Sequence, residues 1–399
     1  MSNTPINRSP DLKKLRDQGY DLTIRGGYLL VSDIPYVNSA KEITRGILVS
    51  KLELAGDVTA KPDNHVAYFM GDHPCRADGI EIAEIKNATE TRTLSDGVTI
   101  NHTFSAKPKP ADNYEDYYEK VTTYVAIISG PAQLIEPGVT AKTFPVVEPE
   151  EEDGDESPFN YIDTSSSRAE IEIVTKKLAL RKIAIVGLGG TGSYVLDLVA
   201  KTPVKEIHLF DGDLFLQHNA FRAPGAPSIE ELQTKPRKTS YLKRTYSNMH
   251  KGIVDHQRCI AADNIEQLQD MDFVFLCVDD APAKEPIVVK LEESGIPFVD
   301  LGMGVDLTDD ALGGILRVTT STTSQRAHVR NRVSFAEADG GNDYATNIQI
   351  ADLNALNAAL AVIKWKKLFG FYRDLKHEHH TTYTTDGNLL INEDRQDEQ

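Results

Sequence analysis

A glycine-rich turn in the second half of the chain has the spacing of a phosphate-binding loop. Residues 187–193 read Gly-Leu-Gly-Gly-Thr-Gly-Ser, after a β-branched apolar run and before a stretch typical of a helix. Glycines allow a tight turn close to a phosphate, and the N–H groups that open the helix then face the anion. Asp211 ends the next apolar run, where a carboxylate can accept hydrogen bonds from a ribose. The sequence therefore predicts a nucleotide site here.

Charged and amide side chains further along indicate which nucleotide binds. They are Asp213, Asn219, Arg222, Lys235, Lys238 and Asp279. The glycine pattern alone favours a dinucleotide such as NAD. Arginine, lysine and carboxylate side chains at one edge of a sheet suit a triphosphate instead, because cations neutralise the phosphates and a carboxylate can hold Mg²⁺. We expect ATP with Mg²⁺, and an NAD-dependent oxidoreductase is the alternative.

In this order the motifs resemble those of the ThiF/MoeB family, the adenylating core of ubiquitin-activating enzymes. The family's G-x-G-G-x-G-S, D-x-D, S-N-x-x-R-Q, helix-opening lysine and C-T-D-N motifs read here as GLGGTGS, DGD, HNAFRA, RK and CVDD. The resemblance covers about residues 165–370. It implies a doubly wound, Rossmann-like α/β domain that binds ATP and Mg²⁺. It also implies that the C-terminal glycine carboxylate of a small ubiquitin-like or sulfur-carrier-like β-grasp protein attacks the α-phosphate.

The resemblance assigns roles by position. The residues that would contact the nucleotide are Gly187, Gly189, Gly190, Thr191, Gly192, Asp211, Asp213, Asn219, Arg222, Lys238 and Asp279. Asp211 would hold the ribose and Asp279 the magnesium, while Lys235 rivals Lys238 as the phosphate lysine. Family members act as dimers and often insert an arginine into the partner's site, so the resemblance implies a homodimer. Arg168 is the candidate for that arginine, and a solvated Arg168 is the alternative.

The cysteines depart from the family pattern. Many members carry a nucleophilic cysteine after the strand equivalent to 314–320 and two zinc-binding C-x-x-C pairs, but residues 278–399 contain no cysteine. We therefore expect no zinc and no thioester at that place. The hydroxyl-rich residues 319–326 suggest an oxyester on Ser321 or Ser324, activated by His328, with an ordinary polar loop as the alternative.

The three cysteines lie elsewhere. Cys75 is a second candidate nucleophile because His73 and Arg76 beside it could lower its pKa, although a turn or core cysteine is the alternative. Cys259 and Cys277 are expected in the core.

An acidic run over residues 148–156 predicts a solvated linker between two domains, because like charges repel and cannot bury apolar area. We place an α+β domain of unknown role at 1–147, the linker at 148–160 and the adenylation domain at 161–399. This arrangement resembles bacterial members of the family that carry an additional N-terminal domain.

Apolar periodicity predicts helices and strands in both domains. Helices are expected at 12–19, 114–129, 192–201, 240–250, 286–295 and 351–370. Strands are expected at 28–34, 45–54, 65–71, 180–187, 205–213, 272–280, 296–304 and 314–320. Strand–helix alternation in the second domain predicts a parallel, doubly wound sheet.

Composition limits the remaining function classes. The 399 residues are 40% hydrophobic and 26% charged, as in an ordinary globular protein. A net charge of −17 disfavours nucleic acid as a partner. The absence of a long apolar run and of an apolar N-terminal segment predicts a cytoplasmic protein that does not enter membranes. A conjugating enzyme is a further partner to test, and adenylation of a peptide or a tRNA base, or a nucleotide-binding scaffold without turnover, are further alternatives.

Overall fold

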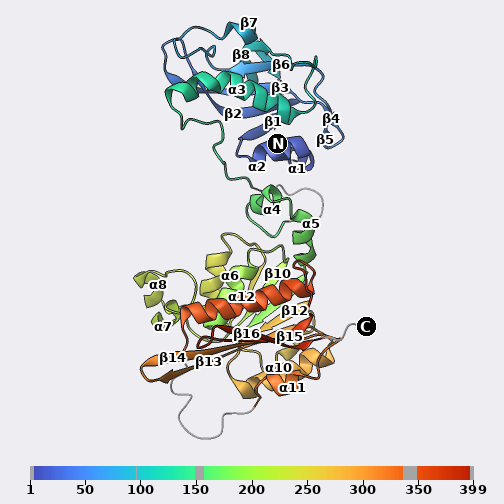
Figure 1. Ribbon diagram of the computed structural model, residues 1–399, viewed down its shortest axis with the longest axis vertical. Coiled ribbons are helices and arrows are strands. Elements are labelled where there is room, and N and C mark those ends of the chain that lie inside the picture. Colours follow the sequence, from blue (N-terminus) through green and yellow to red (C-terminus); the bar gives the residue numbers. More distant parts are fainter. Residues whose placement is uncertain (1–3, 96, 149–156, 336–347, 396–399) are drawn as a thin grey trace. The chain divides into compact units, whose positions relative to one another are not determined.

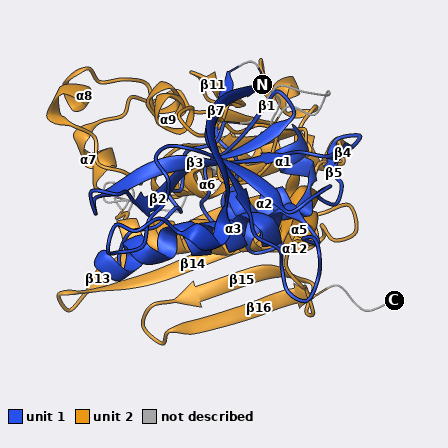
Figure 2. Ribbon diagram, turned by 90° about the horizontal axis from the view of Figure 1, so that it is seen from above, with its two compact units in different colours: residues 1–156, 161–170 blue, residues 157–160, 171–399 orange. Residues whose placement is uncertain are grey.

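Two compact units make up the chain, and residues 4–95, 97–148, 157–335 and 348–395 are described in the computed structural model. One unit holds residues 1–156 and 161–170, and the other holds 157–160 and 171–399 (Figure 2). Most of the acidic run, residues 149–156, lies outside the described residues. None of the helices in these described ranges combines the length and the hydrophobicity that a membrane-spanning helix needs.

Antiparallel pairing organises the first unit, whose described residues form a six-stranded sheet in the order β1-β2-β3-β6-β8-β7 (Figure 1). The strands are β1 (Leu22–Arg25), β2 (Tyr28–Val37), β3 (Ile43–Lys51), β6 (Val66–Met70), β7 (Lys86–Ser95) and β8 (Val98–Ser105), with the small hairpin β4 (Leu54–Ala55) and β5 (Val58–Thr59) beside them. The helices are α1 (Thr4–Arg8), α2 (Pro10–Asp17), α3 (Tyr117–Ile135) and α4 (Thr164–Arg168). The expected α+β class is confirmed, although sequence patterns did not predict β7 and β8.

Helix α3 supplies much of the core of this unit. Tyr117, Val121, Tyr124 and Val125 are buried on one face, as the helical spacing predicts. The tyrosine hydroxyls reach polar partners at the edge of the core, since Tyr117 donates to the Lys51 carbonyl at 2.9 Å. The aromatic residues of α3 therefore pack the domain, each with its polar tip satisfied.

The described residues of the second unit form an eight-stranded sheet in the order β11-β10-β9-β12-β13-β14-β15-β16. The strands are β9 (Lys182–Val186), β10 (Glu206–Phe210), β11 (Ile253–His256), β12 (Phe273–Leu276), β13 (Phe298–Thr308), β14 (Ala311–Ser321), β15 (Glu378–Thr384) and β16 (Leu389–Arg395). The helices are α5 (Glu172–Thr175), α6 (Gly190–Val199), α7 (Gln217–Ala220), α8 (Ile229–Gln233), α9 (Lys238–Tyr246), α10 (Ala281–Glu293), α11 (Val329–Arg332) and α12 (Ala351–Leu368).

Both faces of this sheet are covered by helices. Ile183 and Ile185 of β9 pack in the cluster that includes residues of α6 and α12, whereas Ala184 and Val186 pack in the cluster that includes α10. Figure 1 shows α6 and α12 on one side of the strands and α10 on the other. Burial on both faces explains why the central strands are almost continuously apolar.

The sheet is parallel only from β11 to β13. A two-residue turn, Asp309-Asp310, joins β13 to β14, and both residues have positive φ values of 51° and 62°. Such a turn is too short for a crossover helix and forces an antiparallel pair. The doubly wound class is therefore confirmed, but the expectation of a parallel sheet is wrong from β14 onward, where β14, β15 and β16 pair antiparallel.

Candidate nucleotide-binding site

A cavity of about 620 Å³ opens where β9, β10 and β12 end. Strand β9 lies between β10 and β12. The chain leaves β9 for β10 and β11 on one side and then returns to β12 on the other side. Crevices at such a point are the usual ligand sites of doubly wound sheets. Of the residues expected at the nucleotide, the cavity is lined by Gly187, Gly189, Gly190, Thr191, Asp211, Asp213, Arg222, Lys238 and Asp279.

The glycines of the turn have different structural roles. Gly187 has a φ of +88°, and a Cβ there would lie 2.7 Å from the Cys277 carbonyl oxygen. Gly189 precedes α6 and has open space where a side chain would be. A Cβ at Gly190 would collide with the Asn354 side chain of α12, and one at Gly192 with the Gly187 carbonyl. Gly189 thus leaves room for a ligand, while the other glycines permit the turn and the close packing around it.

Asp211 holds the glycine turn against the second strand. Its Oδ2 accepts the Leu188 N–H at 2.7 Å and its Oδ1 accepts the Asp213 N–H at 2.8 Å, while the residue is only 5% exposed. Lys238 Nζ lies 2.8 Å from Asp213 Oδ2 and 3.5 Å from Asp211 Oδ2. The carboxylate therefore orders the loop backbone as well as facing the cavity.

Replacing Asp211 by alanine is expected to destabilise the protein by about 3 kcal/mol, in addition to weakening ATP binding. The reason is that the buried Leu188 N–H and the partly buried Asp213 N–H lose their acceptor, and Lys238 loses a buried partner. Urea unfolding and ATP titration would measure the two effects. Asp213→Ala is the matched control, since the Asp213 side chain is 69% exposed and should cost below about 1 kcal/mol. Equal stability losses in both variants would contradict this account.

Of the two rival phosphate lysines, Lys238 lines the cavity, whereas Lys235 is exposed and does not line it. Arg222 also lines the cavity, and its Nε has no hydrogen-bond partner among the described residues. Two cations were not predicted from sequence. Lys284 of α10 is buried and pairs with Asp300 at 2.7 Å, and Arg317 enters from β14. Lys284 lies only a few residues after Asp279-Asp280, so the sequence could have indicated it as a cavity residue. The position of Arg317 at the cavity depends on the antiparallel pairing of β14 with β13, which the sequence did not show.

Several predicted residues are not among those that line this cavity. Asn219 is buried, and its Oδ1 accepts the Leu216 N–H, which caps α7. Gly192 lies inside the first turn of α6. Arg168 belongs to the first unit, where its guanidinium lies 5.7 Å from the centre of the Phe144 ring. Ser321 and Ser324 both belong to the described part of the chain, and neither lines the cavity.

The carboxylates near the cavity allow one test of a magnesium role. Among the described residues, no group of three or more histidine, cysteine or acidic side chains could hold a metal ion by itself. Asp280 accepts the Ala283 N–H at the start of α10, and Asp279 is exposed in the cavity wall. Mg²⁺ beside ATP commonly takes one or two carboxylates and fills its other positions with phosphate oxygens and water. Asp279 fits that role.

The expectation that neighbouring basic residues lower the pKa of the Cys75 thiol is wrong. Cys75 is fully buried and donates its S–H to the His73 carbonyl. Burial, with smaller contributions from Glu81, Asp72 and Asp78, raises the pKa of its thiol. Arg76, expected to lower that pKa, pairs with Glu84 instead.

Cys259 is exposed in the loop after β11 rather than placed in the core. It lines the cavity together with the half-buried Cys277, whose pKa is raised by burial.

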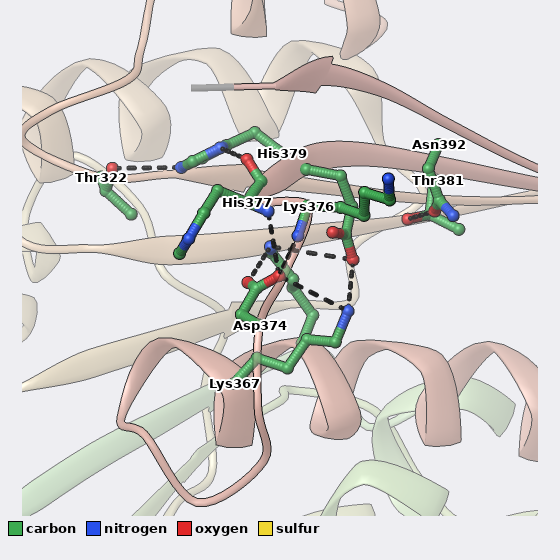
Figure 3. A network of polar contacts seen from close by, with 10 residues as sticks. Thr322, Lys367, Asp374, Lys376, His377, His379, Thr381 and Asn392 are labelled. Atoms are coloured by element: carbon green, nitrogen blue, oxygen red, sulfur yellow. Dashed lines mark hydrogen bonds and ion pairs between the residues drawn. The ribbon is translucent and has the colours of Figure 1, made fainter. Parts of the chain in front are cut away.

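The expected pairing of Ser321 with His328 is not formed. Ser321 is buried at the end of β14, and His328 donates its Nε2 hydrogen to the Thr320 carbonyl at 3.0 Å. Thr322 instead contacts His379, with 3.4 Å between Thr322 Oγ1 and His379 Nε2 (Figure 3). The exposed Ser324 hydroxyl lies 3.0 Å from Thr322 Oγ1.

A group of charged side chains below this contact ties α12 to β15 (Figure 3). Lys364 Nζ lies 3.2 Å from Asp374 Oδ2, and Lys367 Nζ lies 2.7 Å from Glu378 Oε1. Burial raises the pKa of Asp374, but Lys364, the His377 N–H and Lys367 outweigh it, so the net shift is downward. We assign this group a structural role.

The sheet, the glycine turn and the cavity define a nucleotide-binding domain of the doubly wound α/β class. Residues 166–309 match the ThiF family, so the chain contains a ThiF family domain. Residues 10–164 match a domain of unknown function, DUF6791.

Curated relatives and solved structures resemble parts of the chain. Ubiquitin-like modifier-activating enzyme 5 of Drosophila virilis is 23% identical over 164 residues, which span 37% of this chain and 40% of the relative. The chain thus matches less than half the length of that relative. The crystal structure of PaaA is 19% identical over 56% of this chain and 75% of its own, with a TM-score of 0.44. The crystal structure of Escherichia coli MccB with ATP is 17% identical over 57% of this chain and 70% of its own, with a TM-score of 0.45.

Proposed function

We propose that residues 161–399 use ATP to adenylate a carboxylate, namely the C-terminal glycine of a small ubiquitin-like or sulfur-carrier-like protein. A carboxylate oxygen attacks the α-phosphorus, a new O–P bond forms, and the bond from the α-phosphorus to the bridging oxygen breaks. The products are an acyl-adenylate and pyrophosphate. The relative named as an activating enzyme for a ubiquitin-like modifier supports this substrate class.

One observation carries the proposal: a single cavity is lined by the glycine turn, by Lys238 and Arg222, and by Asp279. The N–H groups at the start of α6 would face the phosphates, and the two cations would neutralise the charge that develops on pyrophosphate. Asp211 would accept from the ribose, and Asp279 would hold Mg²⁺, which neutralises phosphate charge when bound. Catalysis would then rest on positioning and electrostatics.

ATP–pyrophosphate exchange tests the proposal. We expect exchange that depends on a β-grasp protein with a diglycine C-terminus and disappears when that tail is removed. Exchange supported only by a short peptide or by tRNA would contradict the substrate class but keep adenylation. Saturable NADH binding without exchange would contradict adenylation itself and favour an oxidoreductase.

The same proposal includes the division of the chain into a domain at 1–147, an acidic linker at 148–160 and the adenylation domain. It also includes a homodimer in which Arg168 acts in the partner's site. A conjugating enzyme or a hydroxyl of this chain would then take the acyl group. The exposed Ser324 hydroxyl contacts Thr322, which in turn contacts His379, and this arrangement supports the second route.

A test of that route is mass spectrometry after incubation with ATP and the modifier. An adduct that hydroxylamine removes and that Ser324→Ala abolishes would support an oxyester. The absence of any such adduct on an enzyme active in exchange would overturn it.

A further inference from the structure

Strand β13 borders the nucleotide cavity with a free edge. It pairs with β14 along its whole length, but with β12 only over residues 298–300. Residues 301–305, which follow, all line the cavity. Successive side chains of a strand point to opposite faces, so consecutive residues can border one cavity only where the strand presents its edge. Beyond residue 300, no described strand pairs with this edge of β13.

Arg317 reaches this side of the cavity over a glycine. Arg317 is the β14 partner of Gly302 in the register of the two strands, and a Cβ at Gly302 would lie 2.9 Å from Arg317 Nη2. The guanidinium therefore lies over the Gly302 backbone, in space that any other residue there would fill with its own side chain. Arg317 is half-buried and lines the cavity.

The charge of Arg317 is not balanced by a carboxylate in the described part of the chain. Its Nη1 hydrogen points to the Arg332 carbonyl oxygen over a long distance of 3.5 Å. Lys284, which lines the same cavity, pairs with Asp300 at 2.7 Å. The β13 side of the cavity is therefore left with the positive charge of Arg317. A guanidinium presents two parallel N–H groups that match the two oxygens of a carboxylate.

The order of the strands separates Arg317 from the nucleotide residues. The glycine turn follows β9, whereas Arg317 belongs to β14, three strands further along the sheet. Neighbouring strands lie about 4.8 Å apart, so about 14 Å separates β9 from β14. The Arg317 side chain spans only the part of this distance that leads back to Gly302. A triphosphate at the glycine turn, with Mg²⁺ at Asp279 after β12, thus leaves the β13 side open for the second substrate.

The direction of β13 determines how a peptide would lie there. Strand β13 runs parallel to β12 and continues past its end. A peptide that enters from the far end of β13 toward Asp279 therefore runs antiparallel to β13, and its last residue lies beside Gly302 and Arg317. Residues 301–305 span about 13 Å, which is enough for about four extended residues.

We propose that residues 301–305 bind the extended C-terminal end of the substrate protein, and that Arg317 pairs with its terminal carboxylate before adenylation. The inference rests on the proposed function and names the residues that select that substrate. Main-chain groups of a strand edge bind any extended peptide, so selection for a free C-terminus comes from Arg317. Of these main-chain groups, the Gly302 carbonyl already accepts the Asn357 Nδ2 hydrogen at 3.0 Å.

The test uses tetraglycine as the probe, tetraglycine amide as its uncharged counterpart, and the ¹⁵N-labelled full chain. We expect tetraglycine to shift the Gly304 amide resonance saturably, and the amide to bind about tenfold more weakly. Arg317→Ala should weaken tetraglycine binding by about tenfold. Gly302→Ala should also weaken it, because the added methyl group displaces the end of the Arg317 side chain while its charge remains. Arg330→Ala is the matched control, since Arg330 is exposed, pairs with Glu292 and does not line the cavity.

Three results would overturn the proposal: no saturable shift, equal affinity for tetraglycine and its amide, or equal affinity in Arg317→Ala and Arg330→Ala. The titration is repeated with α,β-methylene-ATP, and displacement of tetraglycine by this nucleotide would assign Arg317 to the phosphates and also overturn it. The binding experiment involves no turnover. It can therefore fail while ATP–pyrophosphate exchange with a β-grasp protein succeeds, and the reverse.

Discussion

Replacing Lys238 by alanine is expected to lower kcat/KM for ATP–pyrophosphate exchange by about 10²–10³-fold. Losing one well-placed charged or hydrogen-bonding group in an enclosed site typically costs about 2.7–4 kcal/mol of transition-state stabilisation. Lys238 opens α9 at the cavity wall, and its ammonium lies beside Asp211 and Asp213. Exchange kinetics at saturating substrate protein and varied ATP would measure the loss.

Lys235→Ala is the control for that experiment, because Lys235 lies three positions away, is exposed and does not line the cavity. It should exchange like the unmodified protein. Lys238 is 7% exposed, so its loss also removes a buried partner of Asp211 and lowers stability. Exchange must therefore be measured below the unfolding temperature of both variants. Equal activity of the two variants would contradict the assignment of Lys238 to the nucleotide site.

Asp279→Asn is expected to reduce exchange by about 10²-fold or more while leaving the unfolding temperature unchanged. Asparagine keeps the shape of the side chain but removes the charge that would hold Mg²⁺ beside the triphosphate. Asp279 is exposed in the cavity wall, so folding gains little from its charge. The activity loss should shrink at high Mg²⁺ concentration, which a purely structural role would not produce.

The matched control is Glu293→Gln, an exposed carboxylate at the far end of α10 from Asp279. It should leave exchange and its magnesium dependence unchanged. Asp280 is unsuitable as a control because it caps α10 through the Ala283 N–H. Full activity of Asp279→Asn at low Mg²⁺ would contradict the assignment.

Local sequence patterns were sufficient to predict many of the residues that line the nucleotide cavity. The apolar runs before Gly187, Asp211 and Asp279 predict parallel strands, and the carboxyl ends of neighbouring parallel strands meet at one edge. That rule alone brings the glycine turn, Asp211 and Asp279 together. It does not place residues on later strands, because their direction depends on how each connection closes.

Other residues were misplaced because their surroundings come from distant parts of the chain. Cys259 follows a short strand, and nothing near it in sequence shows that it is exposed beside Gly212. Cys75 has basic neighbours in sequence, yet its thiol pKa is set by burial and by Glu81, with which it forms a β-bridge. Charge along the chain is a poor guide to pKa once a group is buried.

For this protein, residue order along the chain was enough to specify the helices and parallel strands around the glycine turn, since apolar spacing and strand ends are local properties. Pairing between strands that are distant in the sequence determined which other side chains lie together. The Asp309-Asp310 turn reverses β14 and brings Arg317 to the cavity. Antiparallel pairing of β6 with β8 places His102 opposite Phe69 and near His73. These contacts join residues far apart in sequence, and only the closed sheets determine which side chains share an environment.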